Sequence, residues 1–171
     1  VIAPNGDRFV LIEFGDEMNL DLNFLGQGLA EALDGGTIPG VIETAPCFAT
    51  TLIHYEPEII AYVDLKQEVS RLIDSLGPSE DIEMDSRLFY FQTLYLDPWS
   101  RECINDYREK INPDKEQDPE FIARVNGLED VSQFVRIHSG TEYWAASLGF
   151  WPGLAFLMPL DPRCRLTVPK Y

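Results

Sequence analysis

The stretch RFVLIEFGDEMNLDLNFLGQGLAEALDGG, residues 8–36, joins two structural periods in one run of the chain. Residues 8–14 form a short apolar run rich in residues that suit a pleated sheet, so they predict a β-strand. Leucines then recur at helical spacing up to the pair Gly35-Gly36, which ends the predicted helix. These leucines are Leu22, Leu25, Leu29 and Leu33. A strand that leads directly into an amphipathic helix predicts a domain of α+β class.

The following segments extend this pattern into a β-α-β-β-α-β order. Residues 41–45 and 50–55 predict two strands, and an apolar stripe that begins near Val63 predicts a second helix. Residues 87–96 are rich in aromatic and β-favouring side chains, so they predict a further strand. Because this is the order of a split-βαβ unit, we predict a ferredoxin-like N-terminal domain over residues 1–96.

The remaining residues, 97–171, predict helices followed by short strands. Asp97-Pro98-Trp99 is typical of a helix start, since proline is tolerated in the first turn. Pro152-Gly153 suits the centre of a type II turn, because proline fixes a negative φ and glycine accepts the positive φ that follows. The predicted segments are helices from Asp97, over 119–126 and over 130–138, and strands over 143–148 and 154–157.

Composition and charge restrict the possible partners. The chain has 171 residues, of which 45% are hydrophobic, enough to bury a sizeable core. Thirteen basic and 29 acidic residues give a net charge of −16, which opposes binding to nucleic acid or to an anionic membrane surface. No uninterrupted apolar run approaches the roughly 18–20 residues that cross a bilayer. We therefore expect neither nucleic acid nor membrane as a partner.

The three cysteines, Cys47, Cys103 and Cys164, are far apart and show no C-x-x-C spacing. Such a distribution favours neither a disulfide framework nor a metal site. We therefore expect reduced thiols, no bound metal and a cytoplasmic location.

Three motifs follow one another in the C-terminal part: HSGTEY at 138–143, LGFWPGLAFL at 148–157 and LDPR at 160–163. Further blocks occur earlier, as LIEFGD at 11–16 and TLIHYEP at 51–57. In this order the blocks resemble subunit 1 of the allophanate hydrolase family. That family includes a subunit of 5-oxoprolinase, the kinase inhibitor KipI and the carboxyltransferase region of urea carboxylases.

The resemblance implies a second domain of cyclophilin-like β-barrel type. The segment 96–126 is longer and more polar than the usual link of the family, so we expect inserted helices there. The family continues past Tyr171 with the rest of the barrel. Residues 97–171 are therefore expected to hold a helical insertion and only the first part of the barrel, apparently truncated.

The resemblance also implies a subunit of a hetero-oligomeric enzyme that works beside a second carboxyltransferase-like subunit. The activity would be ATP-dependent amide hydrolysis of the 5-oxoprolinase type or biotin-dependent carboxyl transfer, acting on a small amide or lactam. ATP or biotin would be handled by partner subunits, with no cofactor bound directly by this chain. Two alternatives stay open: a KipI-like protein that binds and inhibits a kinase, and a structural subunit without catalysis.

Six residues of these motifs are candidates for a site. Arg163, His138 and Tyr143 are the expected catalytic residues, and the bend formed by Gly149, Pro152 and Gly153 is expected to bind substrate. Arg163 either pairs locally with Asp161 or grips an anionic substrate through two parallel hydrogen bonds. His138 is either a helix-end histidine of the core or a functional group, and Tyr143 is either a packed strand tyrosine or a hydrogen-bond donor. Gly149, Pro152 and Gly153 either set the shape of the bend or contact the substrate.

Overall fold

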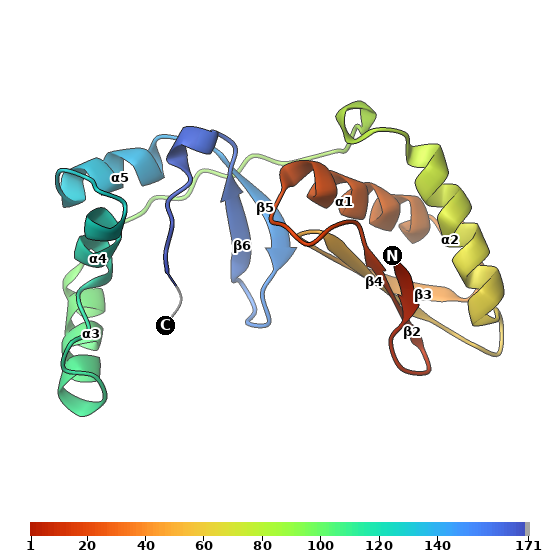
Figure 1. The fold of residues 1–171 in the computed structure, drawn as a ribbon, viewed down its shortest axis with the longest axis horizontal. Helices are drawn as coiled ribbons and strands as arrows, with labels where there is room; N and C mark the ends of the chain where they lie inside the picture. The colour runs from red at the N-terminus through yellow and green to blue at the C-terminus, as the bar shows by residue number, and fades with distance from the viewer. Residues whose placement is uncertain (170–171) are drawn as a thin grey trace. The chain divides into compact units, whose positions relative to one another are not determined.

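The computed structural model describes residues 1–169, which form two compact units (Figure 1). The first unit comprises residues 1–86 together with 145–158. The second comprises residues 87–144 together with the chain from Pro159 onward. The fold is mixed α/β with antiparallel sheets, as the sequence predicts.

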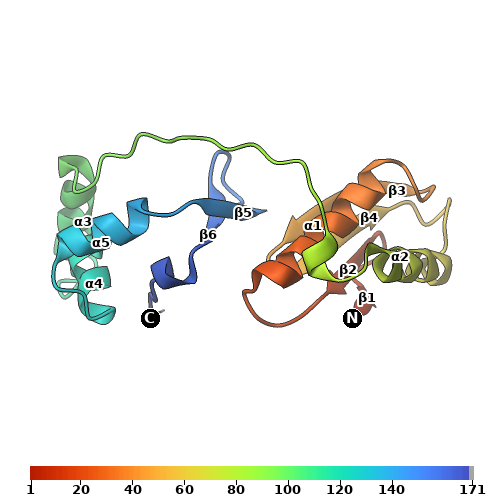
Figure 2. The same ribbon diagram turned by 90° about the horizontal axis from the view of Figure 1, so that it is seen from above.

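The first unit contains a four-stranded antiparallel sheet in the order β1-β2-β4-β3 (Figure 2). Its register follows from the hydrophobic pattern: Ile12 of β2 lies opposite Ile2 of β1 and Thr51 of β4. A shift of one residue would turn the apolar side chains away from the core. The strands are β1 (Ile2–Pro4), β2 (Phe9–Glu13), β3 (Val41–Cys47) and β4 (Thr50–Tyr55).

Helices α1 (Leu20–Asp34) and α2 (Tyr62–Leu76) pack on the apolar face of this sheet. Asn19 caps α1 by accepting a hydrogen bond from the Asp21 N–H, and the helix ends before Gly36, whose φ is +71°. Both predicted helices are confirmed. The core is formed by alternate residues of β2 and β4 and by one stripe of each helix: Val10, Ile12, Ile53, Tyr55, Leu29, Leu33, Leu65 and Val69.

The strand predicted over residues 87–96 is wrong. This segment is extended and belongs to neither sheet, and the apolar side chains of 88–91 are exposed. In a β-α-β-β-α-β unit the last strand would pair beside the first, but β1 already occupies that edge of β2. The observed order of the sheet-forming unit is β-β-α-β-β-α, so the ferredoxin-like description is not confirmed.

Three helices of the second unit lie where the sequence predicts them. Asp97 and Asp130 cap α3 and α5 by accepting hydrogen bonds from the backbone N–H groups of Ser100 and Gln133. Such caps satisfy N–H groups that the helix itself leaves without partners. The helices are α3 (Pro98–Lys110), α4 (Asp118–Val125) and α5 (Val131–Ser139), and short 3-10 turns occur at η1 (Ser79–Asp81) and η2 (Pro162–Cys164).

A two-stranded sheet is formed by β5 (Tyr143–Leu148) and β6 (Ala155–Pro159). The loop between them contains the expected type II turn, since the Leu154 N–H donates to the Trp151 carbonyl at 3.0 Å and Gly153 has a φ of +81°. Gly149 is also required, because a Cβ there would lie 2.7 Å from the Leu154 carbonyl oxygen. Both predicted strands and the turn are therefore confirmed.

The buried amide of Asn23 ties this hairpin to the rest of the first unit. Its Nδ2 donates to the carbonyl oxygens of Phe48, at 2.8 Å, and of Ala146, at 2.9 Å. Phe48 lies between β3 and β4 with a positive φ of 23°, an uncommon conformation for a residue other than glycine. One side chain of α1 thus holds the β3–β4 connection and the middle of β5.

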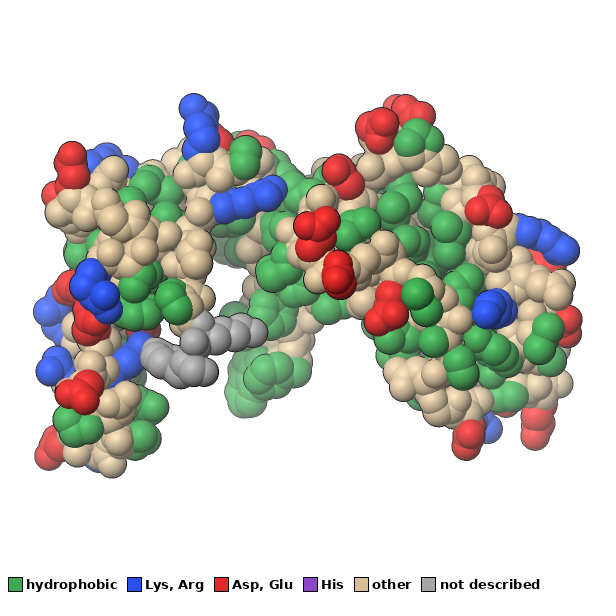
Figure 3. All heavy atoms as spheres, viewed as in Figure 1, with side chains coloured by type: hydrophobic (Ala, Val, Ile, Leu, Met, Phe, Trp, Pro, Cys, Tyr) green, Lys and Arg blue, Asp and Glu red, His purple; other side chains and the backbone are tan. Residues whose placement is uncertain are grey.

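The charge is distributed unequally between the two units. Residues 1–86 carry 17 acidic and three basic side chains, a net charge of −14, and residues 145–158 carry none. In Figure 3 acidic side chains accordingly outnumber basic ones over α1 and α2, whereas both signs alternate over α3 and α4. No helix within residues 1–169 is long and apolar enough to cross a membrane.

Two valines of α2 provide a test of the described core. Val69 is fully buried, whereas Val63 is 61% exposed. We expect Val69→Asp to lower the free energy of unfolding by about 3 kcal/mol or more, because the carboxylate would be buried without a partner. Val63→Asp should change it by less than about 0.5 kcal/mol, since surface substitutions have small effects. Denaturant unfolding measures both, and equal midpoints for the two variants would contradict the packing of α2.

The Asn23 amide provides a second test. Asn23→Asp keeps the size of the side chain but replaces the donating nitrogen by an oxygen that faces two carbonyl oxygens. We expect it to cost more than Asn23→Ala, for which the loss of two buried hydrogen bonds is worth about 2–4 kcal/mol. Asn5→Asp, at an exposed position, is the control. Unfolding free energies that rank Asn23→Asp as the milder variant would argue against the bridging role.

Candidate functional site

The six candidate residues fall into two sets that belong to different units. His138, Tyr143 and Arg163 are in the second unit, and Gly149, Pro152 and Gly153 form the β5–β6 loop in the first. Each set is therefore described by itself. The roles of all six residues stay predictions.

His138 lies in the last turn of α5, inside a cluster of aromatic rings. The Tyr95 hydroxyl is 2.6 Å from Nδ1 of His138, and the Tyr143 hydroxyl donates to the His138 backbone carbonyl at 2.7 Å. The imidazole centroid lies 5.7 Å from the rings of Tyr95 and Phe134 and 5.4 Å from that of Tyr143. Both the ring and the backbone of His138 are thus held in place.

This environment changes the acidity of the three polar side chains. Desolvation among the rings lowers the pKa of His138, although part of the residue stays exposed to solvent. Desolvation raises the pKa of Tyr95 and of Tyr143, and for Tyr143 the charges of Tyr95 and Cys164 add to the rise. At neutral pH the imidazole is therefore mainly uncharged and both phenols are protonated.

Sequence reasoning missed Tyr95. It precedes His138 by 43 residues, and its aromatic-rich segment has the composition of a strand. A tyrosine in an extended segment gives no signal of its own. Only the fold places its hydroxyl at the histidine.

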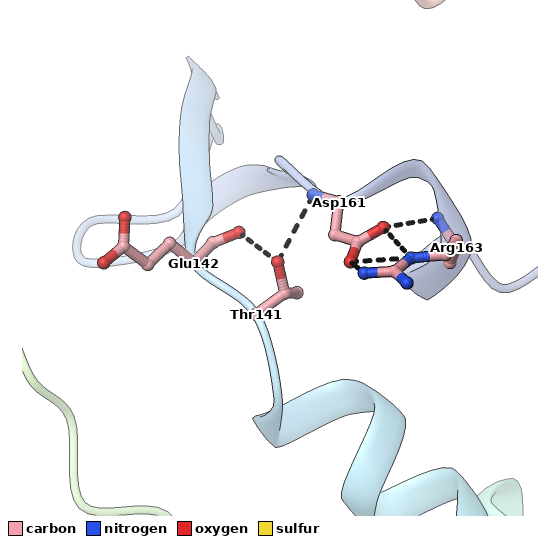
Figure 4. A network of polar contacts seen from close by, with 4 residues as sticks. All are labelled: Thr141, Glu142, Asp161 and Arg163. Atoms are coloured by element: carbon pink, nitrogen blue, oxygen red, sulfur yellow. Dashed lines mark hydrogen bonds and ion pairs between the residues drawn. The ribbon is translucent and has the colours of Figure 1, made fainter.

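Arg163 is held by the carboxylate of Asp161 (Figure 4). Its NH2 group lies 2.6 Å from Oδ2, its Nε lies 3.0 Å from Oδ1, and its own backbone N–H donates to Oδ1 at 2.9 Å. Behind this pair, the Asp161 N–H donates to the Thr141 hydroxyl at 3.3 Å. The local pair that the sequence allowed is therefore formed.

The guanidinium keeps capacity for a second anion. The Arg163 side chain is 89% exposed, and among residues 1–169 its NH1 group has no hydrogen-bond partner. Because Asp161 already occupies one edge of the fork, a substrate carboxylate would have to bind at the NH1 edge or displace Asp161. Arg163 as a substrate clamp stays a prediction.

The β5–β6 loop presents apolar side chains rather than charged ones. Phe150 is 93% exposed, and Leu148, Trp151 and Leu154 are exposed as well. Gly149 and Gly153 are required by the backbone itself, as the turn geometry demands. The shape-setting role of these glycines is thus evident, and a contact with substrate stays a prediction.

A family model of the carboxyltransferase domain, subdomains C and D, matches residues 1–171. The chain belongs to this family. The similarity includes urea amidolyase of Saccharomyces cerevisiae, 25% identical over 100% of the chain and 10% of that protein. It also includes a 5-oxoprolinase subunit of Bacillus subtilis, 26% identical over 95% of the chain and 64% of that protein. The resemblance inferred from the motifs is confirmed.

The fold of this carboxyltransferase domain agrees with solved relatives. The urea carboxylase of Kluyveromyces lactis superposes with a TM-score of 0.79 at 23% identity, covering 99% of the chain and 15% of that structure. TTHA0988 superposes with a TM-score of 0.63 at 21% identity, covering 96% of the chain and 28% of that structure. The chain spans less than two thirds of each of these proteins, so it corresponds to one part of them.

The Asp161–Arg163 pair makes a measurable prediction. Hydrogen bonds from the guanidinium and the backbone N–H of Arg163 lower the pKa of Asp161 from 3.8 to about 2. Because the folded-state pKa is depressed, the contribution of the pair to stability is complete above about pH 4 and is lost as pH falls through about 2.

We expect carbon-13 NMR titration to give the Asp161 carboxyl a midpoint of about 2, and Arg163→Met to raise that midpoint toward 3.8. Methionine keeps an unbranched apolar stem but removes the charge. Arg165→Met, two residues further along at an exposed position, is the matched control and should leave the midpoint unchanged. A normal midpoint in the wild type would contradict the pair.

Proposed function

We propose that this chain is part of a hetero-oligomeric enzyme that acts on the carbonyl group of a small amide or lactam. The single observation that carries the proposal is the match of the whole chain to the carboxyltransferase domain. The proteins similar to it include a urea amidolyase, a putative urea carboxylase and a subunit of 5-oxoprolinase. Urea and 5-oxoproline share a carbonyl bonded to nitrogen, which is the group expected to react here.

Both candidate chemistries develop negative charge on a carbonyl oxygen. Carboxyl transfer from carboxybiotin to a urea-type nitrogen and ATP-dependent opening of a lactam each need donors aimed at that oxygen. The side chains of His138 and Arg163 and the backbone of the β5–β6 loop are the expected donors. ATP and biotin are expected to be handled by partner subunits, among them a second carboxyltransferase-like subunit.

The finer description of the fold belongs to this proposal. The paired strands β5 and β6 are consistent with the beginning of a cyclophilin-like barrel, with α3 to α5 as the inserted helices. A two-stranded sheet is only marginally stable alone, and this one exposes Leu148, Phe156 and Leu157. These side chains support an interface with further protein. A cytoplasmic location remains a prediction.

The test uses the complete gene product that contains this chain, purified together with the subunits that it retains. ADP release is measured with 5-oxoproline in one arm and with urea, bicarbonate and the biotinylated subunit in the other. We expect one of the two substrates to stimulate ATP turnover. No stimulation by either substrate, together with inhibition of a co-purified kinase, would favour a KipI-like binding protein instead.

The same assay tests Arg163. If its fork binds a carboxylate or carbamate, Arg163→Lys should lose roughly a hundredfold in kcat/KM, as Arg163→Ala does, because lysine keeps the charge but not the two-pronged geometry. Arg165→Lys is the matched control. Retention of activity within a few-fold in both Arg163 variants, at an unchanged melting temperature, would restrict Arg163 to its pairing with Asp161.

A further inference from the structure

His138 has one nitrogen that is held and one that is available. Nδ1 faces the Tyr95 hydroxyl at 2.6 Å, whereas Nε2 forms no hydrogen bond with any residue from 1 to 169. Three rings, those of Tyr95, Phe134 and Tyr143, surround the imidazole. Because the residue is still exposed, its open edge faces solvent.

The direction of the hydrogen bond follows from the chemistry of the two groups. A phenol hydroxyl donates a hydrogen bond more strongly than the N–H of a neutral imidazole, and the bare imidazole nitrogen accepts better than a phenol oxygen. The Tyr95 hydroxyl has no other hydrogen-bond partner within the described residues, so its proton points to Nδ1. The proton of the neutral ring is then on Nε2.

We propose that Tyr95 is a positioning residue that fixes His138 in the tautomer protonated at Nε2, so that this N–H can donate a hydrogen bond to a substrate oxygen. The two tyrosines beside the ring have separate tasks. Tyr143 donates to the backbone carbonyl of His138 and fixes the end of α5, but it makes no hydrogen bond to a ring nitrogen. Only Tyr95 selects the tautomer.

A neutral donor suits the oxygen of a carbonyl group. It stabilises negative charge as that charge develops, and it cannot be lost by deprotonation near neutral pH. The lowered pKa of His138 is consistent with this role, since it keeps the ring uncharged. The ligand class is the carbonyl oxygen of a small amide or lactam, and this part of the inference rests on the proposed function.

The sequence contains only two histidines, which makes the tautomer directly observable. The full gene product is labelled with nitrogen-15 in its histidine rings and studied by NMR at about pH 8, where a histidine of ordinary pKa is neutral. His138→Gln assigns the resonances. His54, whose Nδ1 lies 3.2 Å from Glu43, is an internal control in the other unit.

We expect the wild-type His138 to show a protonated Nε2 and a hydrogen-bonded, unprotonated Nδ1. Tyr95→Phe should move the Nδ1 resonance to that of a free nitrogen and allow both tautomers. Tyr90→Phe is the matched control, because Tyr90 lies in the same extended segment and is 89% exposed. A proton on Nδ1 in the wild type, or unchanged shifts in Tyr95→Phe, would overturn the inference.

Kinetics of the assembled enzyme test the donor role separately. Tyr95→Phe keeps the ring but loses one hydrogen bond, so kcat should fall about three- to tenfold while KM and the melting temperature stay near wild type. Unchanged kcat would overturn the donor role. If the enzyme turns over neither 5-oxoproline nor urea, the proposed function fails, whereas the NMR result still decides the role of Tyr95.

Discussion

The first unit depends on one buried hydrogen-bonding group, the side-chain amide of Asn23. A buried amide is costly unless its hydrogens are satisfied, and here two backbone carbonyls from distant segments accept from its nitrogen. The positive φ of Phe48 and the placement of β5 beside α1 both follow from this requirement. The apolar core then only has to fill the space between helices and sheet.

Local patterns predicted most of the elements of this fold. The leucine spacing of α1 and the Pro152-Gly153 turn carry their structure in adjacent residues, and both were predicted correctly. The strand expected over 87–96 was wrong, because composition cannot show that β1 already fills the sheet edge. Residues 2–4 are too few to give a strand signal by themselves, so the ferredoxin-like order could not be corrected from sequence.

The candidate site shows the same division. The motifs identified His138, Tyr143 and Arg163, and the choice of Asp161 as a local partner for Arg163 follows from their separation by two residues. The contact of Tyr95 with His138 depends on how an extended segment passes α5, and no periodicity encodes that path. Sequence therefore found the residues with recognisable motifs, and structure found the one that acts on them.

The hydrogen bond from Asn23 to Ala146 spans 123 positions of the chain, with most of the second unit inserted between its ends. A ribosome that adds about 5–20 residues per second needs roughly 6–25 s to make that stretch. During this time α1 and the β3–β4 connection can form, while the second carbonyl that Asn23 binds does not yet exist. Closure of the first unit is therefore a late step of synthesis, and the second unit can fold before the first is complete.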